Sequence, residues 1–232
     1  MKLKKALIFG ITGQDGSYLS KYLLKKKYKV YGISRGKNFS NLKKLNILKK
    51  IKIYTLKKNS KNNIKNILKK NFNEIYFLGG QSNVLESFKI DYETYLSQVS
   101  PVRDILNFIL LQKGRKTKFL FAGSCEMFGK INGKKKISEN DKKKPQSPYG
   151  LSKYIGYEII KTYRQMFNLP VCTAILFNHE SNLRTNKYVF KKIIDSVKKI
   201  NINSNFKLNI GNINIKRDWG WAPEYMEACN KI

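Results

Sequence analysis

The stretch FGITGQDGSYL, residues 9–19, decides the fold of this chain. It follows a short apolar run, residues 6–9, that predicts a buried strand, and it leads into an amphipathic segment, residues 18–27, that predicts a helix. Glycines at a regular spacing occupy the turn between them: Gly10, Gly13 and Gly16. Without side chains at these positions, backbone amides and the helix N-terminus can approach a pyrophosphate. We therefore predict a dinucleotide site, against the alternative of a purely structural turn.

The end of the next predicted strand, residues 29–33, indicates which dinucleotide the site takes. Folds that bind NAD usually place an Asp or Glu at about this distance, where it binds the ribose hydroxyls. This chain has Arg35 there, and a planar guanidinium suits a 2′-phosphate. The position favours NADP, and a solvated arginine is the alternative in so basic a protein. With Arg35, the residues expected to contact the cofactor here are Gly10, Ile11, Thr12, Gly13, Gln14, Asp15 and Gly16.

Length and composition fit one globular domain. A chain of 232 residues with 41% hydrophobic residues can bury a sizeable core. No apolar run is long enough to cross a bilayer, and residues 1–5 lead directly into the first strand, so we expect neither a transmembrane helix nor a signal peptide. The expected location is the cytoplasm, with no membrane partner.

The formal charge of +32 raises the question of nucleic-acid binding. Only six of the 47 basic residues are Arg, and the lysines are spread along the chain without the interleaved aromatic residues of a stacking platform. We interpret them as solvated faces that bind polyanions non-specifically at low salt. No specific nucleic-acid partner is expected.

The cysteines and the single histidine argue against a metal centre. Cys125, Cys172 and Cys229 stand far apart and include no C-x-x-C pair, which argues against both a disulfide framework and zinc. His179 is the only histidine of the chain, which excludes a metal site built on several of its histidines. We expect no bound metal ion.

Beyond the glycine-rich turn, apolar runs alternate with helical patterns. Strands are predicted at residues 51–54, 75–78, 119–122 and 171–177, and helices at residues 64–70, 92–111 and 149–167. This alternation predicts an α/β fold, a doubly wound, mostly parallel Rossmann-type sheet with helices on both faces. A lysine-rich stretch, residues 130–144, is interpreted as an exposed loop between a strand and a helix.

The pattern changes after Phe177. It predicts a helix around residues 190–200, a short strand near residues 208–210 and a last helix from about residue 223. That helix stops at Ile232 with no cap and no tail, so we expect a fragment or a truncated paralogue.

Tyr149 and Lys153 form a Y-x-x-x-K pair at the start of a predicted helix. Residues at this spacing emerge on the same helix face. An ammonium beside a phenol lowers the pKa of the phenol and can also hold a ribose, so the pair predicts a tyrosinate-like base for an alcohol proton. The spacing is common by chance, and its place downstream of the glycine-rich turn gives it weight.

Ser124 and Glu126 follow the predicted strand at residues 119–122. Ligands of open parallel sheets bind at the carboxyl ends of the strands, so both residues are expected to face the crevice that holds Tyr149. Ser124 can hydrogen-bond a substrate hydroxyl, and Glu126 can act as a second acid or base. The alternative for Glu126 is a surface carboxylate.

Together these residues resemble those of the GDP-mannose 4,6-dehydratases, a family of extended short-chain dehydrogenases/reductases. The resemblance covers residues 4–228 and is strongest in GITGQDGSYL, SPYGLSK, ILFNHES and GNINIKRDWG, which are residues 10–19, 147–153, 175–181 and 211–220. It implies a catalytic set of Ser124, Glu126, Tyr149 and Lys153. It implies further cofactor contacts at Leu78, Gln81, Tyr149, Lys153, His179 and Arg184. It implies substrate contacts at Ser82, Asn178 and Arg217.

The activity implied by the resemblance is dehydration of GDP-mannose to GDP-4-keto-6-deoxymannose, on the way to GDP-fucose. Tyr149 would take the C4 hydroxyl proton as hydride passes to NADP, and the hydride would later return to C6. Glu126 would remove the C5 proton and assist the loss of water from C6. Two alternatives stay open: a related NADP-dependent sugar-nucleotide epimerase or reductase, and a truncated, non-catalytic nucleotide-binding paralogue.

The resemblance also implies a domain division and an assembly. Residues 1–177 would form the NADP-binding Rossmann domain with the catalytic residues, and residues 178–232 an incomplete substrate-binding portion. The family forms homo-oligomers, so a dimer or tetramer is expected. The chain departs from the family at two places. It has Thr55-Leu56 where the family has an Asp-Leu pair that contacts adenine. It also differs at residues 182–185, the position of the family's loop that reaches the cofactor of a neighbouring subunit.

Overall fold

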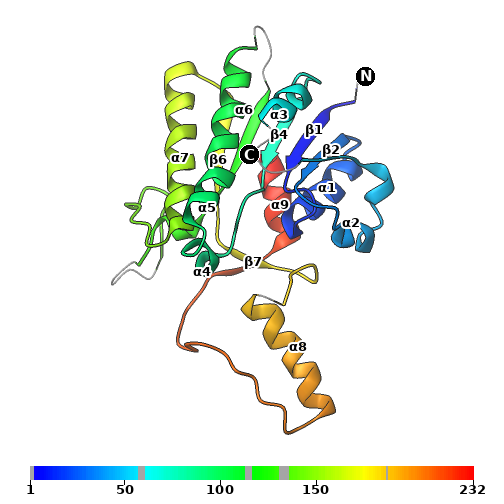
Figure 1. Ribbon diagram of the computed structural model, residues 1–232, viewed down its shortest axis with the longest axis vertical. Helices are drawn as coiled ribbons and strands as arrows, with labels where there is room; N and C mark the ends of the chain where they lie inside the picture. The colour runs from blue at the N-terminus through cyan, green and yellow to red at the C-terminus, as the bar shows by residue number, and fades with distance from the viewer. Residues whose placement is uncertain (1–2, 57–60, 113–116, 131–135, 187) are drawn as a thin grey trace.

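The computed structural model describes residues 3–56, 61–112, 117–130, 136–186 and 188–232. They contain a six-stranded parallel sheet in the order β3-β2-β1-β4-β5-β6. Its strands are β1 (Lys5–Phe9), β2 (Lys29–Ser34), β3 (Lys52–Thr55), β4 (Glu74–Phe77), β5 (Lys118–Ser124) and β6 (Val171–Leu176). Helices cover both faces of this sheet (Figure 1). The predicted α/β fold with a doubly wound, Rossmann-type sheet is therefore confirmed.

The central strands read as continuous apolar runs because both of their faces are covered. In β1, Ala6, Leu7 and Ile8 are fully buried. The strand order reverses beside β1, since β2 lies on one side of it and β4 on the other. In open α/β sheets a ligand crevice forms at the carboxyl edge of such a reversal.

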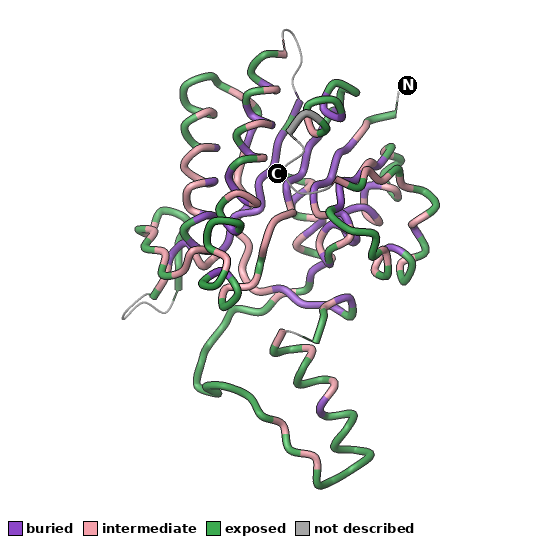
Figure 2. Tube along the Cα trace, in the orientation of Figure 1, coloured by how far each residue is buried: buried purple, intermediate pink, exposed green. Residues whose placement is uncertain are grey.

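Two hydrophobic clusters cover the two faces of the sheet. The first joins α1 (Gln14–Lys25) and α9 (Ala222–Lys231) to the sheet through residues such as Leu19 and Met226. The second joins α6 (Ser100–Leu110) and α7 (Pro148–Phe167) to it through Ile105 and Ile160. The buried segments lie along the strands, and the outward sides of the helices are exposed (Figure 2). The helices that precede β6 are α1 (Gln14–Lys25), α2 (Ser40–Lys44), α3 (Lys61–Leu68), α4 (Val84–Ser87), α5 (Asp91–Gln98), α6 (Ser100–Leu110) and α7 (Pro148–Phe167).

The helix predicted at residues 92–111 is divided into α5 and α6. The break falls at Val99, and Pro101 stands in the first turn of α6. A proline ring has no N–H to donate to the preceding turn, but it is well tolerated where a helix begins. One long predicted helix therefore becomes two successive helices.

Beyond β6, the helices predicted around residues 190–200 and from about residue 223 are confirmed, but the strands differ from the prediction. Residues 203–218 contain no strand among their described residues, so the strand predicted near residues 208–210 is wrong. A second, two-stranded parallel sheet instead pairs β7 (Asn178–Glu180) with β8 (Trp219–Trp221). The sequence pattern around residue 208 is apolar, but that segment has no neighbouring strand with which to pair. The described part of the lysine-rich loop is largely exposed, and residues 131–135 lie outside the described residues.

The last helices take different positions. Helix α8 (Val189–Ile202) projects away from the sheet, whereas α9 (Ala222–Lys231) returns to pack on α1 (Figure 1). Ala222, Met226 and Cys229 of α9 are buried in the same cluster as β1. Within the part of the chain that the structure describes, no helix has both the length and the apolar character to cross a membrane.

Candidate active site

The glycine-rich turn lies at the carboxyl edge of β1, where the strand order reverses. Gly10 has a φ of 78°, a conformation that only glycine adopts at little cost. A Cβ atom on Gly10 would lie 2.8 Å from the Cα of Gly79, and one on Gly16 would lie 2.3 Å from the Gly10 carbonyl oxygen. The backbone next to the N-terminus of α1 is therefore not covered by side chains. The first amides of that helix have no hydrogen-bond partners within the helix. This cradle fits the pyrophosphate of a dinucleotide.

A cleft of about 1210 Å³ opens beside this turn. Most of the predicted site residues line this cleft, and they include predicted catalytic, cofactor-binding and substrate-binding residues. They are Gly10, Thr12, Gly13, Gln14, Asp15, Gly16, Arg35, Leu78, Ser82, Ser124, Glu126, Tyr149, Lys153, Asn178, His179 and Arg184. A small-molecule site usually has a volume of about 300–1,000 Å³. The larger cleft leaves room for a dinucleotide and a second ligand together.

Three predicted site residues do not line the cleft. The side chain of Ile11 is fully buried in the core, so only its backbone belongs to the turn. The Gln81 amide donates to the carbonyl oxygen of Asn83 at 2.7 Å. Arg217 is exposed and donates to the backbone carbonyl of its neighbour, Lys216, at 3.1 Å. The side chains of Ile11 and Gln81 are engaged elsewhere, whereas the charge of Arg217 still acts on Cys125, which lines the cleft.

Ser124, Glu126 and Tyr149 come together at one end of the cleft. Ser124 ends β5, and its hydroxyl accepts a hydrogen bond from the Glu126 backbone N–H at 3.2 Å. The same Ser124 side chain hydrogen-bonds to Tyr149, the second residue of α7. The N-terminus of α7 is fixed by the Ser147 hydroxyl, which accepts from the Gly150 N–H at 3.0 Å. Helix capping and the end of β5 therefore position the predicted catalytic residues.

The electrostatics of Tyr149 differ from the prediction. Burial raises the pKa of the phenol above its ordinary value, and the hydrogen bond to Ser124 offsets this only in part. Lys153 does not point at the hydroxyl: its Nζ donates to the Ala122 carbonyl at 2.7 Å and lies 5.8 Å from the centre of the Tyr149 ring. The expected lowering of the Tyr149 pKa is therefore absent from this structure. Burial lowers the pKa of Lys153 to about 7, and the charge of Asp15 opposes that shift.

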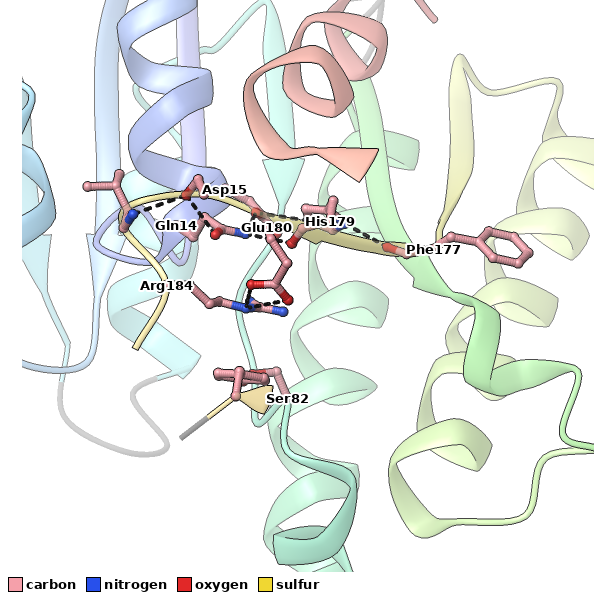
Figure 3. A network of polar contacts seen from close by, with 10 residues as sticks. Gln14, Asp15, Ser82, Phe177, His179, Glu180 and Arg184 are labelled. Carbon is pink, nitrogen blue, oxygen red and sulfur yellow. Dashed lines mark hydrogen bonds and ion pairs between the residues drawn. The ribbon is translucent and has the colours of Figure 1, made fainter. Parts of the chain in front are cut away.

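His179 joins the glycine-rich turn to β7 (Figure 3). Its Nε2 lies 3.0 Å from a carboxylate oxygen of Asp15, and its Nδ1 lies 2.7 Å from the carbonyl oxygen of Phe177. Gln14 reinforces the connection by donating to Asp15 and to the His179 carbonyl, each at 3.1 Å. The Ser181 hydroxyl in turn donates to Gln14 at 2.7 Å. These contacts fix β7 against the first turn of α1.

Two residues that the sequence analysis did not single out extend this site. The Glu180 carboxylate binds the Arg184 guanidinium at 3.1 Å, and that guanidinium stacks 3.8 Å above the ring centre of Tyr188. The Tyr188 hydroxyl hydrogen-bonds to the Ser82 hydroxyl at 3.1 Å across the cleft. Glu180 could have been found as a member of the ILFNHES segment. Nothing local to Tyr188 indicates its contact with Ser82.

The far end of the cleft holds the predicted 2′-phosphate residue. Arg35 follows β2, is exposed and lines the cleft. Leu56 lines the cleft too, whereas Thr55 is exposed and does not. Among the described residues, no three His, Cys, Asp or Glu side chains gather as a metal site requires.

A family model described as GDP-mannose 4,6 dehydratase matches residues 7–232. The chain belongs to this family. It is 36% identical to GDP-mannose 4,6 dehydratase 2 of Caenorhabditis elegans, over 99% of this chain and 63% of that protein. It is also 36% identical to the human GDP-mannose 4,6 dehydratase, over 96% of this chain and 63% of that protein. This family member thus spans just under two thirds of the length of these relatives.

Solved structures share the fold of this dehydratase-family chain. The dTDP-glucose 4,6-dehydratase of Bacillus anthracis, solved in complex with NAD, superposes with a TM-score of 0.82 and 17% identity, over 98% of this chain and 70% of that chain. The UDP-glucose 4-epimerase of Thermotoga maritima, solved with UDP-glucose, superposes with a TM-score of 0.83 and 18% identity, over 97% of this chain and 72% of that chain. At these identities the likeness shows the fold alone.

Proposed function

We propose that the protein is an NADP-dependent hydro-lyase that dehydrates GDP-mannose to GDP-4-keto-6-deoxymannose. One observation carries the proposal: Ser124, Glu126 and Tyr149 meet in the cleft that also contains the glycine-rich cradle. Membership of the GDP-mannose 4,6-dehydratase family supports the choice of substrate.

The roles of the residues follow from their chemistry. Tyr149 in its phenolate form takes the proton of the substrate's C4 hydroxyl, and Ser124 holds that hydroxyl through its own oxygen. When bound, the nicotinamide supplies the hydride acceptor for C4 and the hydride donor for C6. The ketone at C4 acidifies the C5 hydrogen, which Glu126 removes before the same carboxyl group protonates the departing C6 hydroxyl. Return of hydride to C6 would leave an enolate, which takes a proton at C5 and so balances the proton that Tyr149 took from the C4 hydroxyl.

The retained carboxyl favours elimination over the neighbouring chemistries. An epimerase or reductase acting at C4 needs no base at C5, so it has no use for Glu126. A non-catalytic paralogue needs none of the three residues. The present arrangement therefore supports the dehydratase more than either alternative.

The direct test uses the protein at its natural length, incubated with GDP-mannose and NADP⁺. We expect a product lighter than GDP-mannose by one water and without net cofactor reduction, detected by mass spectrometry and by absorbance. Binding of NADPH without any such product would instead support the non-catalytic paralogue. A C4 epimer of unchanged mass would support the epimerase.

We expect Arg35→Gln to weaken NADPH binding by about tenfold to hundredfold, because it removes a charged hydrogen bond to the 2′-phosphate. NADH, which lacks that phosphate, should bind the variant as it binds the wild type. Fluorescence titration with both cofactors measures the difference.

The control is Arg103→Gln, which removes an exposed arginine from α6, outside the cleft lining. It carries the same charge change and should leave both affinities unaltered. Equal losses for NADH and NADPH in Arg35→Gln would argue against a role in choosing NADP.

The remaining parts of the proposal concern organisation. Residues 1–177 serve as the NADP-binding Rossmann domain and residues 178–232 as part of the substrate-binding portion, with α9 packed against the first. Asn178 and Ser82 line the cleft and fit a substrate role. A homo-oligomeric state and a cytoplasmic location remain predictions from the family and the sequence.

A further inference from the structure

The first turn of α1 combines two opposite charges at the proposed cofactor site. Amides at a helix N-terminus and the helix dipole attract an anion. Asp15 occupies this first turn and lines the cleft, and its side chain is 25% exposed. An ionised carboxylate there repels a pyrophosphate that approaches the same amides. The site therefore needs a cation next to Asp15.

His179 lies where such a cation is needed, at ion-pair distance from Asp15. Its Nδ1 hydrogen-bonds to the Phe177 carbonyl at 2.7 Å. Its Nε2 lies 3.0 Å from the Asp15 carboxylate, which is an ion-pair distance, but the contact lacks hydrogen-bond geometry. A carboxylate this close to a buried imidazole stabilises the doubly protonated, positively charged ring. The ring is 7% exposed and stacks on Tyr225, with ring centres 4.6 Å apart. Its proton is therefore shielded from water and held beside Asp15.

We propose that His179 is a cofactor-positioning residue whose positive charge cancels that of Asp15 and so admits the pyrophosphate of a dinucleotide to the N-terminus of α1. This inference rests on the proposed dinucleotide binding but does not depend on which sugar nucleotide is the substrate. It predicts that cofactor binding and protonation of His179 strengthen each other.

The direction of the pH effect follows from the surroundings. Burial lowers the pKa of His179, but the Asp15 carboxylate and the Phe177 carbonyl together raise it above its ordinary value. Asp15 itself is held ionised. Burial raises its pKa, but the contacts with His179 and Gln14 outweigh burial and leave the pKa below its ordinary value. Other titratable groups face the pair from each neighbouring element: Lys153, Glu180, Arg184, Tyr225 and Cys229.

Of these groups, Lys153 matters most for the experiment. Arg184 and Glu180 bind each other at 3.1 Å and so compensate their own charges. Lys153, with its pKa near 7, loses its proton in the same pH range as His179. Cofactor affinity of the wild type therefore falls as pH rises for two reasons. Because the charge of Asp15 also acts on Lys153, only the part that is lost in His179→Gln belongs to the proposal.

The test is a double-mutant cycle in which NADPH affinity is measured from about pH 6 to about pH 9, the range over which a histidine with a raised pKa titrates. Asp15→Asn keeps the size and one acceptor oxygen, replaces the other oxygen by an amide donor and removes the charge. The fall in its NADPH affinity across this pH range should be about tenfold smaller than that of the wild type. A tenfold difference corresponds to a coupling of one pKa unit. His179→Gln should bind about tenfold more weakly than the wild type at the acidic end.

The combined variant decides the question. If His179 acts by cancelling the charge of Asp15, then Asp15→Asn restores the affinity of His179→Gln to nearly that of the wild type. If His179 only packs on Tyr225 and supports β7, the second substitution restores nothing, and the inference is overturned. Identical pH profiles for the wild type and His179→Gln overturn it too. Failure of the wild type to bind NADPH or NADH at any pH would refute the cofactor proposal itself, a separate outcome.

Discussion

Glu126→Gln abolishes formation of the dehydrated product while the protein still oxidises GDP-mannose at C4. The expected loss is about 10²- to 10⁴-fold, the usual contribution of a general acid or base. A glutamine amide is nearly the same size but cannot accept the C5 proton or donate one to the leaving hydroxyl. The turn itself should survive, because Ser124 binds the backbone N–H of residue 126 rather than its side chain.

Two measurements separate this result from misfolding. NADPH affinity should be unchanged, and NADPH absorbance should appear on addition of GDP-mannose to enzyme and NADP⁺, since the reaction stalls after oxidation. Glu139→Gln, a change of an exposed carboxylate in the loop before α7, is the matched control and should leave turnover intact. Full dehydration by Glu126→Gln would remove Glu126 from the mechanism.

Tyr149→Phe should stop the reaction one step earlier. Without the phenol no group takes the C4 hydroxyl proton, so we expect a loss of about 10²- to 10⁴-fold in turnover and no NADPH signal at all. The buried phenol has a raised pKa, so its phenolate is favoured by rising pH. At saturating NADP⁺, turnover of the wild type should accordingly increase with pH.

The control for this variant lies on the same helix. Tyr154 of α7 is outside the cleft lining and stacks on Tyr157 with ring centres 6.5 Å apart. Tyr154→Phe makes the same chemical change, loss of a phenolic hydroxyl, at another position of α7 and should leave turnover unchanged. A Tyr149→Phe variant that still accumulates NADPH from GDP-mannose would show that another group accepts the C4 proton.

The two variants together locate the stalled step. Glu126→Gln should allow oxidation and block elimination, whereas Tyr149→Phe should block oxidation. Because Ser124 contacts both Tyr149 and the Glu126 backbone, a Ser124→Ala variant would disturb both and separates them poorly.

The sequence by itself determined the fold and much of the cleft wall. Buried parallel strands require continuous apolar runs, and the turn at Gly10 and Gly16 requires glycine, so both leave local signals. Ser124, Glu126 and Tyr149 could be placed at one edge because the carboxyl ends of parallel strands share that edge. The apolar pattern of residues 92–111 predicted one helix, but the chain forms two, with Pro101 in the first turn of the second. Hydrophobic periodicity carries no information about the missing N–H donor of proline.

Only the tertiary structure decided which distant residues meet. The Asp15–His179 pair, the Tyr188–Ser82 contact and the return of α9 onto α1 depend on the path of the chain between them. The direction of the Tyr149 pKa shift was decided in the same way, because burial and the orientation of Lys153 are properties of the folded chain. Local periodicity reports which face of an element is buried, but not which element covers it.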